Sequence, residues 1–126
     1  MSKKVLVVED DPKNLKLFRD LLQRFGFEVT EATDGEMGVE AARSGQPDLI
    51  LMDIMMPKMD GLEATRIIKA DPETKHIPVV ALTSFAMSGD RERALSAGCD
   101  DYIAKPVDVH QLIGTVQGFC RQGVGK

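Results

Sequence analysis

Five polar residues suited to phosphate chemistry stand at the ends of short, mostly apolar runs. They are Glu9, Asp10, Asp53, Thr83 and Lys105. The runs that precede them cover residues 5–8, 49–52, 78–82 and 101–104. If these runs are neighbouring strands of a parallel sheet, their carboxyl ends lie along one rim, where ligands bind. The sequence therefore predicts one polar site made of acids, a hydroxyl group and a cation.

These residue types are suited to metal-assisted phosphoryl transfer onto Asp53. A carboxylate can attack phosphorus to give an acyl phosphate. Neighbouring acids would repel the incoming dianion, so a hard cation such as Mg²⁺ is needed, and Glu9 and Asp10 are placed to hold it. Lys105 offers a second positive charge to the phosphoryl oxygens, and the Thr83 hydroxyl offers a hydrogen-bond donor.

Each of these residues also has a simpler explanation. Asp53 alone could cap the turn after its strand, and Glu9, Asp10 and Asp11 could be an acidic cluster at a helix start, favoured by the helix dipole. Thr83 alone is uninformative. Their occurrence together favours a phosphoryl-transfer site, because four expected strands each carry a suitable residue at the carboxyl end. The bond between Lys105 and Pro106 is a candidate for cis geometry, which would direct the lysine.

The elements that position these residues alternate along the chain. Strands are expected near residues 4–8, 27–31, 48–53, 78–82 and 100–104. Longer amphipathic stretches separate them, a pattern typical of βα units and a parallel sheet. Glu28 and Glu31 make the second strand resemble an edge strand.

The helices are indicated by their start and stop signals. Asp11 followed by Pro12 is typical of a helix start, and Gly26 of a helix end. The other helices are expected at about 35–44, 61–70, 88–97 and 108–121. The fourth is nearly all polar at its start, so it is either solvated or weakly held and able to move.

Size and composition favour one domain that spans residues 1–126, with an ordered core at about 3–121 and a frayed tail. The net charge of −4 argues against nucleic acid or an anionic membrane as the main partner. Cys99 and Cys120 fit no disulfide or zinc pattern and are interpreted as reduced thiols. No signal peptide or membrane-spanning stretch is recognisable, so we expect a cytoplasmic protein without membrane insertion.

The motifs together are more specific than any one of them. The matching segments are 5–11, 47–57, 60–61, 78–83 and 98–106. Over essentially its whole length the chain resembles a response-regulator receiver domain. The resemblance implies an α/β fold: a flavodoxin-like (βα)5 domain, doubly wound, with a parallel five-stranded sheet in the order 2-1-3-4-5.

The resemblance also implies roles for the site residues. Asp53 matches the phosphoacceptor, Glu9 and Asp10 the metal-binding acids, and Lys105 the lysine that contacts the phosphoryl group. The backbone carbonyl of Met55 matches a further Mg²⁺ ligand.

A switch pair is implied as well. Thr83 matches a threonine that moves toward the phosphoryl group, and Tyr102 a ring that turns inward behind it. The alternative for Tyr102 is a strand tyrosine with its hydroxyl at the surface. Ser84 and Met55 depart from the commoner residues at positions that influence how long the phosphate survives.

The implied function is two-component signal transduction. A partner, either a histidine kinase or a histidine phosphotransfer protein, would donate the phosphoryl group, since His76 and His110 are interpreted as surface residues. Phosphorylation would alter the face formed by the fourth helix, fifth strand and fifth helix, which would bind a downstream protein. The chain would not be an enzyme beyond promoting its own phosphorylation and dephosphorylation. The run 83–90 with Gly98 and Cys99 further resembles stand-alone receivers that control cell division.

Two alternatives remain open. A phosphatase of the haloacid dehalogenase type also uses an aspartate nucleophile with Mg²⁺, but it needs a second aspartate two residues later, where this chain has Met55. A pure interaction module would keep the fold without being phosphorylated, and the intact acids and Lys105 argue against it.

Overall fold

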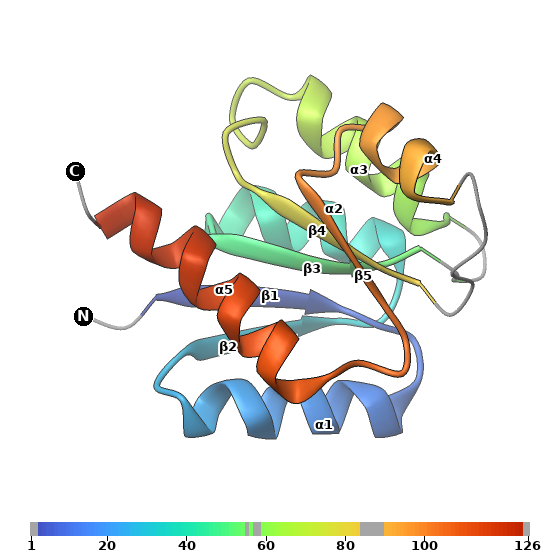
Figure 1. Cartoon of the computed structure of the whole chain (residues 1–126). Helices are drawn as coiled ribbons and strands as arrows, with labels where there is room; N and C mark the ends of the chain where they lie inside the picture. Colours follow the sequence, from blue (N-terminus) through green and yellow to red (C-terminus); the bar gives the residue numbers. More distant parts are fainter. Residues whose placement is uncertain (1–2, 55, 57–58, 84–89, 125–126) are drawn as a thin grey trace.

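In the part of the chain that the structure describes, five strands alternate with five helices (Figure 1). The computed structural model describes residues 3–54, 56, 59–83 and 90–124. The strands are β1 (Lys4–Val8), β2 (Glu28–Ala32), β3 (Leu49–Asp53), β4 (Val79–Thr83) and β5 (Asp101–Ala104). The helices are α1 (Pro12–Arg24), α2 (Gly35–Gly45), α3 (Gly61–Ala70), α4 (Asp90–Ser96) and α5 (Val109–Val124).

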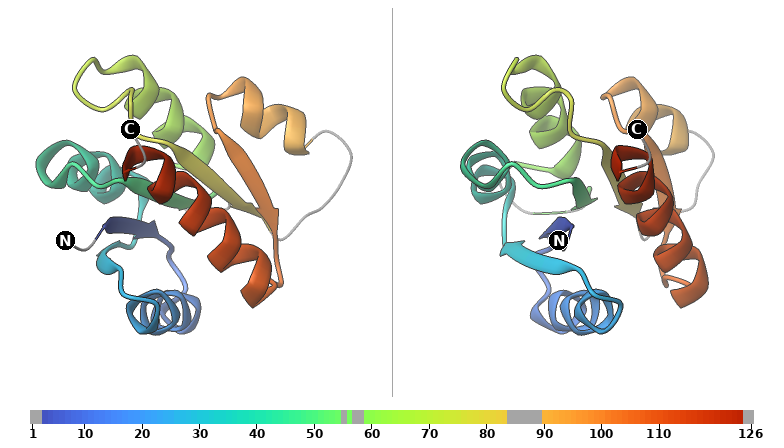
Figure 2. Two further views of the ribbon diagram at one scale, coloured as in Figure 1. Left: turned by 60° about the vertical axis from the view of Figure 1, so that its left-hand side comes forward. Right: turned by 90° about the vertical axis from the view of Figure 1, so that its left-hand side faces the viewer.

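All neighbouring strands are parallel, and their order in the sheet is β2-β1-β3-β4-β5. This confirms the predicted fold class and strand order. Helices cover both faces of the sheet (Figure 2). Buried residues of α1 and α5 share one core cluster, whereas those of α2, α3 and α4 share the other.

The three central strands are apolar on both faces because helices cover both. Every residue of β3 and β4 is buried, and so are the last four residues of β1. A strand buried on both faces has a continuous apolar sequence rather than an alternating one. In β2, by contrast, Glu28 is exposed and Glu31 half-buried, which confirms the expected edge strand.

Four of the described helices begin at aspartate caps. The carboxylates of Asp11, Asp34 and Asp60 accept hydrogen bonds from the N–H groups of Lys13, Met37 and Glu63 at 2.9, 2.8 and 2.8 Å. The cap of α5 is Asp108, whose Oδ1 accepts from the N–H of Gln111 at 3.1 Å. Such caps satisfy backbone donors that have no partner within the helix. They confirm the predicted helix starts at Pro12, Gly35 and Gly61. Gly26, with φ of 92°, follows the end of α1 as expected.

A few boundaries differ from the sequence expectations. β2 is displaced by one residue, and α5 ends at Val124 rather than near 121. The predicted start of the fourth helix at about 88 lies outside the described residues, and the described part of α4 has seven residues. The frayed tail stays a prediction. Within the described ranges, no helix is long and apolar enough to cross a membrane.

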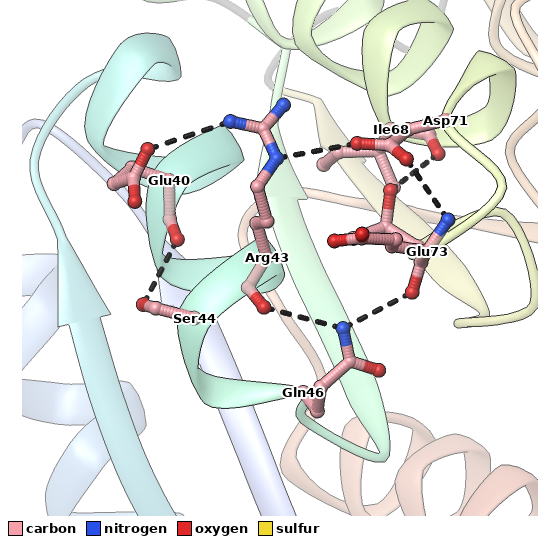
Figure 3. Close-up of polar contacts among 8 residues, drawn as sticks. Glu40, Arg43, Ser44, Gln46, Ile68, Asp71 and Glu73 are labelled. Atoms are coloured by element: carbon pink, nitrogen blue, oxygen red, sulfur yellow. Dashed lines mark hydrogen bonds and ion pairs between the residues drawn. The ribbon is translucent and has the colours of Figure 1, made fainter.

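A polar network joins the end of α2 to the segment between α3 and β4, at the rim opposite the carboxyl ends of the strands (Figure 3). Gln46 has a left-handed backbone with φ of 47°, and its Nε2 donates to the carbonyls of Glu73 and Arg43 at 3.0 and 3.3 Å. Nε of Arg43 lies 3.2 Å from Oδ2 of Asp71. These contacts connect the end of α2 to the segment that follows α3, far from the site residues.

Candidate functional site

Parallel pairing brings the predicted site residues to one rim of the sheet. Glu9 directly follows β1, Asp53 ends β3, Thr83 ends β4, and Lys105 directly follows β5. In the register of the sheet, Asp53 pairs with Leu82 and Thr83 pairs with Ala104. The four polar residues therefore end adjacent strands at nearly one level.

Glu9 is held deep at this rim, with only 1% of its surface exposed. Its N–H donates to the carbonyl of Ala32 at 3.0 Å, which extends the pairing of β1 with β2. One carboxylate oxygen, Oε2, accepts from the N–H of Asp11 at 3.3 Å. The other, Oε1, accepts from Nζ of Lys105 at 2.7 Å. The carboxylate is thus fixed by main chain on one side and by the lysine on the other.

Lys105 connects the two buried acids. Its Nζ lies 2.7 Å from Oε1 of Glu9 and 3.3 Å from Oδ2 of Asp53. Its backbone N–H donates to the carbonyl of Thr83 at 2.6 Å. The peptide bond between Lys105 and Pro106 is cis, as the sequence suggested. The lysine is thus anchored to the end of β4 while its ammonium group reaches the ends of β1 and β3.

Glu9, Asp10 and Asp53 form a cluster suited to a hard cation. One carboxylate oxygen from each lies within 4.8 Å of the others, with Asp10 exposed and the other two buried. Oxygen donors of this kind are those that Mg²⁺ prefers, with water completing its coordination. The donor set therefore fits Mg²⁺. Met55, whose carbonyl was predicted to join these ligands, lies outside the described residues.

The electrostatics of the site follow from burial of opposite charges. Burial raises the pKa of Glu9 to about 7; the hydrogen bond from Lys105 opposes this rise, and the nearby Asp53 adds to it. Burial lowers the pKa of Lys105, but the hydrogen bond to Glu9 and the charges of Asp53 and Glu9 outweigh it, so this pKa is raised overall. The lysine stays charged, whereas Glu9 can take up a proton near neutral pH.

The predicted switch residues lie on adjacent strands. Thr83 is fully buried, and Tyr102 is partly buried against the core cluster shared by α2, α3 and α4. Ala81, two residues before Thr83, pairs with Tyr102. The two side chains are therefore placed along the β4–β5 border, and their movement stays a prediction.

Sequence reasoning missed two features of the site. The ion pair between Glu9 and Lys105 joins residues 96 positions apart, and no local pattern announces it. The close contact of Gly61 with the backbone of Asp53 was also missed, although the pair Asp60 and Gly61 had been noted as a motif. Only the position of α3 against the end of β3 reveals that contact.

Comparison with known proteins identifies the family. The model of the response regulator receiver domain matches residues 5–117. This chain is a response-regulator receiver. It is 47% identical over 119 residues to the polar-differentiation response regulator DivK of Brucella abortus (strain 2308), an alignment that covers 94% of the receiver and 97% of the relative. DivK of Brucella ovis shows the same identity and coverage.

Solved structures agree with this assignment. The receiver domain of sensor histidine kinase PA1611 from Pseudomonas aeruginosa PAO1 has a TM-score of 0.88 and 38% identity, and the match covers 95% of this receiver and 98% of that chain. That structure holds a magnesium ion in its active site cleft. Chemotaxis response regulator CheY4 of Vibrio cholerae has a TM-score of 0.88 and 27% identity, covering 94% of this receiver and 99% of that chain.

The receiver is therefore a signalling protein of two-component systems, similar to DivK. Phosphorylation of an aspartate and binding of Mg²⁺ are characteristic of this family, whose members interact with histidine kinases and downstream targets. These findings confirm the predicted fold and family and do not favour the phosphatase alternative.

Proposed function

We propose that Asp53 accepts a phosphoryl group from a phosphohistidine of a partner protein. The observation that carries this proposal is the convergence of buried Asp53 with Glu9, Asp10 and Lys105 at one rim. In the transfer, the bond between phosphorus and the imidazole nitrogen breaks, and the electron pair stays on nitrogen. A new bond forms between phosphorus and a carboxylate oxygen of Asp53.

The other residues lower the electrostatic cost of this transfer. Glu9, Asp10 and Asp53, with the carbonyl of Met55, would hold Mg²⁺, which supplies positive charge to the phosphoryl oxygens. Lys105 adds a second positive charge from the side of β5. Its Nζ is already 3.3 Å from Oδ2 of Asp53, so little rearrangement is required. The same groups would assist hydrolysis of the aspartyl phosphate, so the receiver would promote its own phosphorylation and dephosphorylation.

A hollow beside the site supports delivery of the phosphoryl group by a partner. It has a volume of about 440 Å³ and is lined by Asn14, Leu17, Phe18, Lys105, Pro106 and Val107. The side chain of Leu17 is largely exposed at this edge. An apolar surface that reaches Lys105 suits a protein that carries the phosphohistidine, such as a histidine kinase or a histidine phosphotransfer protein.

We infer that the phosphorylated receiver signals through the α4–β5–α5 face. Thr83 would move toward the phosphoryl group, Tyr102 would turn inward, and a pre-existing equilibrium of this face would shift. The backbone bond from Lys105 to Thr83 supports coupling between the site and β5. Leu95 of α4 and Val109 of α5 are exposed and suit contact with a downstream protein. Likeness to DivK, a polar-differentiation response regulator, supports a role in polar differentiation. A role in cell division and a cytoplasmic location stay predictions from the sequence.

Intact mass spectrometry after treatment with acetyl phosphate tests the proposal. We expect one added phosphoryl group in the unmodified protein with Mg²⁺, and none with a chelator or in Asp53→Asn. Asp34→Asn is the matched control, because Asp34 caps α2 outside the acidic cluster and asparagine caps equally well. Asp34→Asn should be phosphorylated like the unmodified protein.

Two results would count against the proposal. Phosphorylation of Asp53→Asn at the unmodified level would mean that another residue is the acceptor. Absence of any adduct under rapid sampling, together with no beryllofluoride complex by fluorine NMR, would support an interaction module that is never phosphorylated.

A further inference from the structure

The first residue of α3 packs directly on the backbone of the proposed phosphoacceptor. A Cβ atom added to Gly61 would collide with the carbonyl oxygen of Asp53 and lie 2.7 Å from Cα of Ile54. Carbon–carbon contacts are optimal only at about 3.5–4.0 Å. The atoms it would meet belong to the main chain, so no side-chain rotation can remove the clash. Only glycine allows this close approach.

Gly61 cannot withdraw easily from this position. Its N–H donates to the carbonyl of Ile54 at 3.3 Å, and its carbonyl accepts from the buried hydroxyl of Thr65 at 2.7 Å. The preceding residue, Asp60, caps α3 through the N–H of Glu63. The bonds of Thr65 and Asp60 lie within α3 and fix its first turn, so Gly61 can withdraw only together with the helix; that would break the bond to Ile54 and pull the buried residues of α3 out of the core. A methyl group at residue 61 would therefore push mainly on its neighbour, the peptide group of Asp53.

Asp53 is the last residue of its strand and pairs with a neighbouring strand on one side. It pairs with Leu82 on β4, whereas the pairs between β3 and β1 end at Val8 and Met52. On the side of β1 the strand pairs have ended before Asp53, and its carboxylate lies near that of Glu9 in the acidic cluster. Contact with Gly61 therefore supplies a main-chain restraint at the point where the strand ends.

We propose that Gly61 is a positioning residue for phosphorylation: its bare Cα lets α3 fix the peptide group of Asp53, and hence the acceptor carboxylate, relative to Glu9, Asp10 and Lys105. This inference rests on the proposed function of Asp53. A substitution that shifts Asp53 slightly would misalign the attacking oxygen, although the fold would remain. Misplacement of a reacting group by 1 Å can slow a reaction about a hundredfold.

Phosphorylation kinetics of Gly61→Ala test the proposal. The maximal rate of phosphorylation by acetyl phosphate at saturating Mg²⁺ is measured and divided by the folded fraction at the same temperature. We expect a decrease of about a hundredfold. In metal-free samples, the amide NMR signals of Asp53 and Ile54 should also shift. The shift is a readout of geometry that is independent of the reaction.

Two control variants distinguish a displacement of Asp53 from a general loss of protein stability. Gly114→Ala adds a methyl group to α5 where nothing lies within 4 Å, so its rate should be unchanged. Leu22→Ala opens a cavity in the core cluster under α1 and lowers the unfolding temperature. Its rate per folded molecule should also be unchanged, and the signals of Asp53 and Ile54 should stay in place.

The outcomes distinguish this inference from the proposed function. A Gly61→Ala rate equal to that of the unmodified protein would overturn the role of Gly61 while leaving Asp53 as the acceptor. No phosphorylation of the unmodified protein, together with no beryllofluoride complex, would overturn the proposed function itself. If Gly61→Ala does not fold, Thr65→Val decides, because it removes the bond that fixes Gly61 within the first turn of α3, the turn that contacts Asp53, without adding bulk. A several-fold slower rate supports the inference, and an unchanged rate contradicts it.

Discussion

The ammonium group of Lys105 lies 2.7 Å from Oε1 of Glu9, although the two residues are 96 positions apart in the chain. Both side chains are well shielded from water, with 13% and 1% of their surfaces exposed. The same ammonium group also reaches Oδ2 of Asp53 at 3.3 Å. One lysine thus faces two buried carboxylates, and the protonation of Glu9 becomes coupled to any cation that enters the site.

Binding of Mg²⁺ is expected to release a proton from Glu9. Burial raises the pKa of this carboxyl to about 7, whereas a metal ligand must be the carboxylate. The affinity for Mg²⁺ should therefore increase as pH rises through about 7. Isothermal titration calorimetry in two buffers of different ionisation enthalpy would measure the protons released near that pH.

The control for this prediction is Glu9→Gln, which keeps the shape of the side chain but cannot release a proton. This variant should bind Mg²⁺ more weakly, and its binding enthalpy near neutral pH should be the same in both buffers. Equal proton release from Glu9→Gln and the unmodified protein would assign the proton to another group and contradict the prediction.

The metal-free protein should lose stability as pH rises. The pKa of Glu9 is raised from 4.5 to about 7 in the folded state. Between these values the folded state binds more protons than the unfolded state, so the free energy of unfolding falls with increasing pH. The contribution of Glu9 is fully present below its unfolded pKa and is lost as pH passes its folded pKa.

Urea unfolding in a chelator, on the acid and the alkaline side of this window, would measure the effect. The stability of the unmodified protein relative to Glu9→Gln should decrease from the lower to the higher pH. A difference that is constant or increases with pH would show that Glu9 is not buried as a proton-binding group.

A separate prediction concerns Asp100, which directly precedes β5 and binds residues of α3 and β4 at the amino ends of these strands. Its Oδ2 accepts from Nζ of Lys69 at 2.9 Å and from the N–H of Val79 at 2.8 Å. Lys69 in turn donates to the carbonyl of Ile77 at 2.8 Å. Asp100→Ala leaves a partly buried N–H without its acceptor, and we expect a loss of about 1–2 kcal/mol in the free energy of unfolding.

The matched comparison for Asp100→Ala is Asp20→Ala, which removes the exposed pairs with Lys16 and Arg19 on α1. Solvent screens exposed pairs of this kind, so the loss of stability should be smaller than that of Asp100→Ala. Denaturant unfolding of both variants at one pH gives the two values directly. Equal losses would mean that the bond from Val79 to Asp100 adds nothing beyond a surface ion pair.

Local sequence signals determined the elements and the residue types at the rim. Apolar runs of about five residues predict strands, and their alternation with amphipathic stretches predicts a parallel sheet. Asp11 before Pro12 predicts a helix start because its carboxylate finds its partner, the N–H of Lys13, only two residues away. The placement of Asp53 and Thr83 at strand ends follows from the same short-range pattern.

Other features depended on how distant segments pack. Gln46 adopts a left-handed backbone at the end of α2, and its side chain binds the carbonyl of Glu73, a contact made by the position of a separate loop. The ends of β2 and α5 differ from those expected from the sequence, because residues at the boundaries of helices and strands have weak local preferences.

By itself, the sequence determined the fold class, the strand ends and the kinds of side chain gathered there. Only the tertiary structure decided that Lys105 pairs with Glu9, that burial raises the pKa of Glu9 to about 7, and that Gly61 lies against Asp53. The physical reason is that the tendency of a segment to form a strand depends on residues close to it in the sequence. Distances across the rim depend instead on the register of several strands and on the depth at which helices pack.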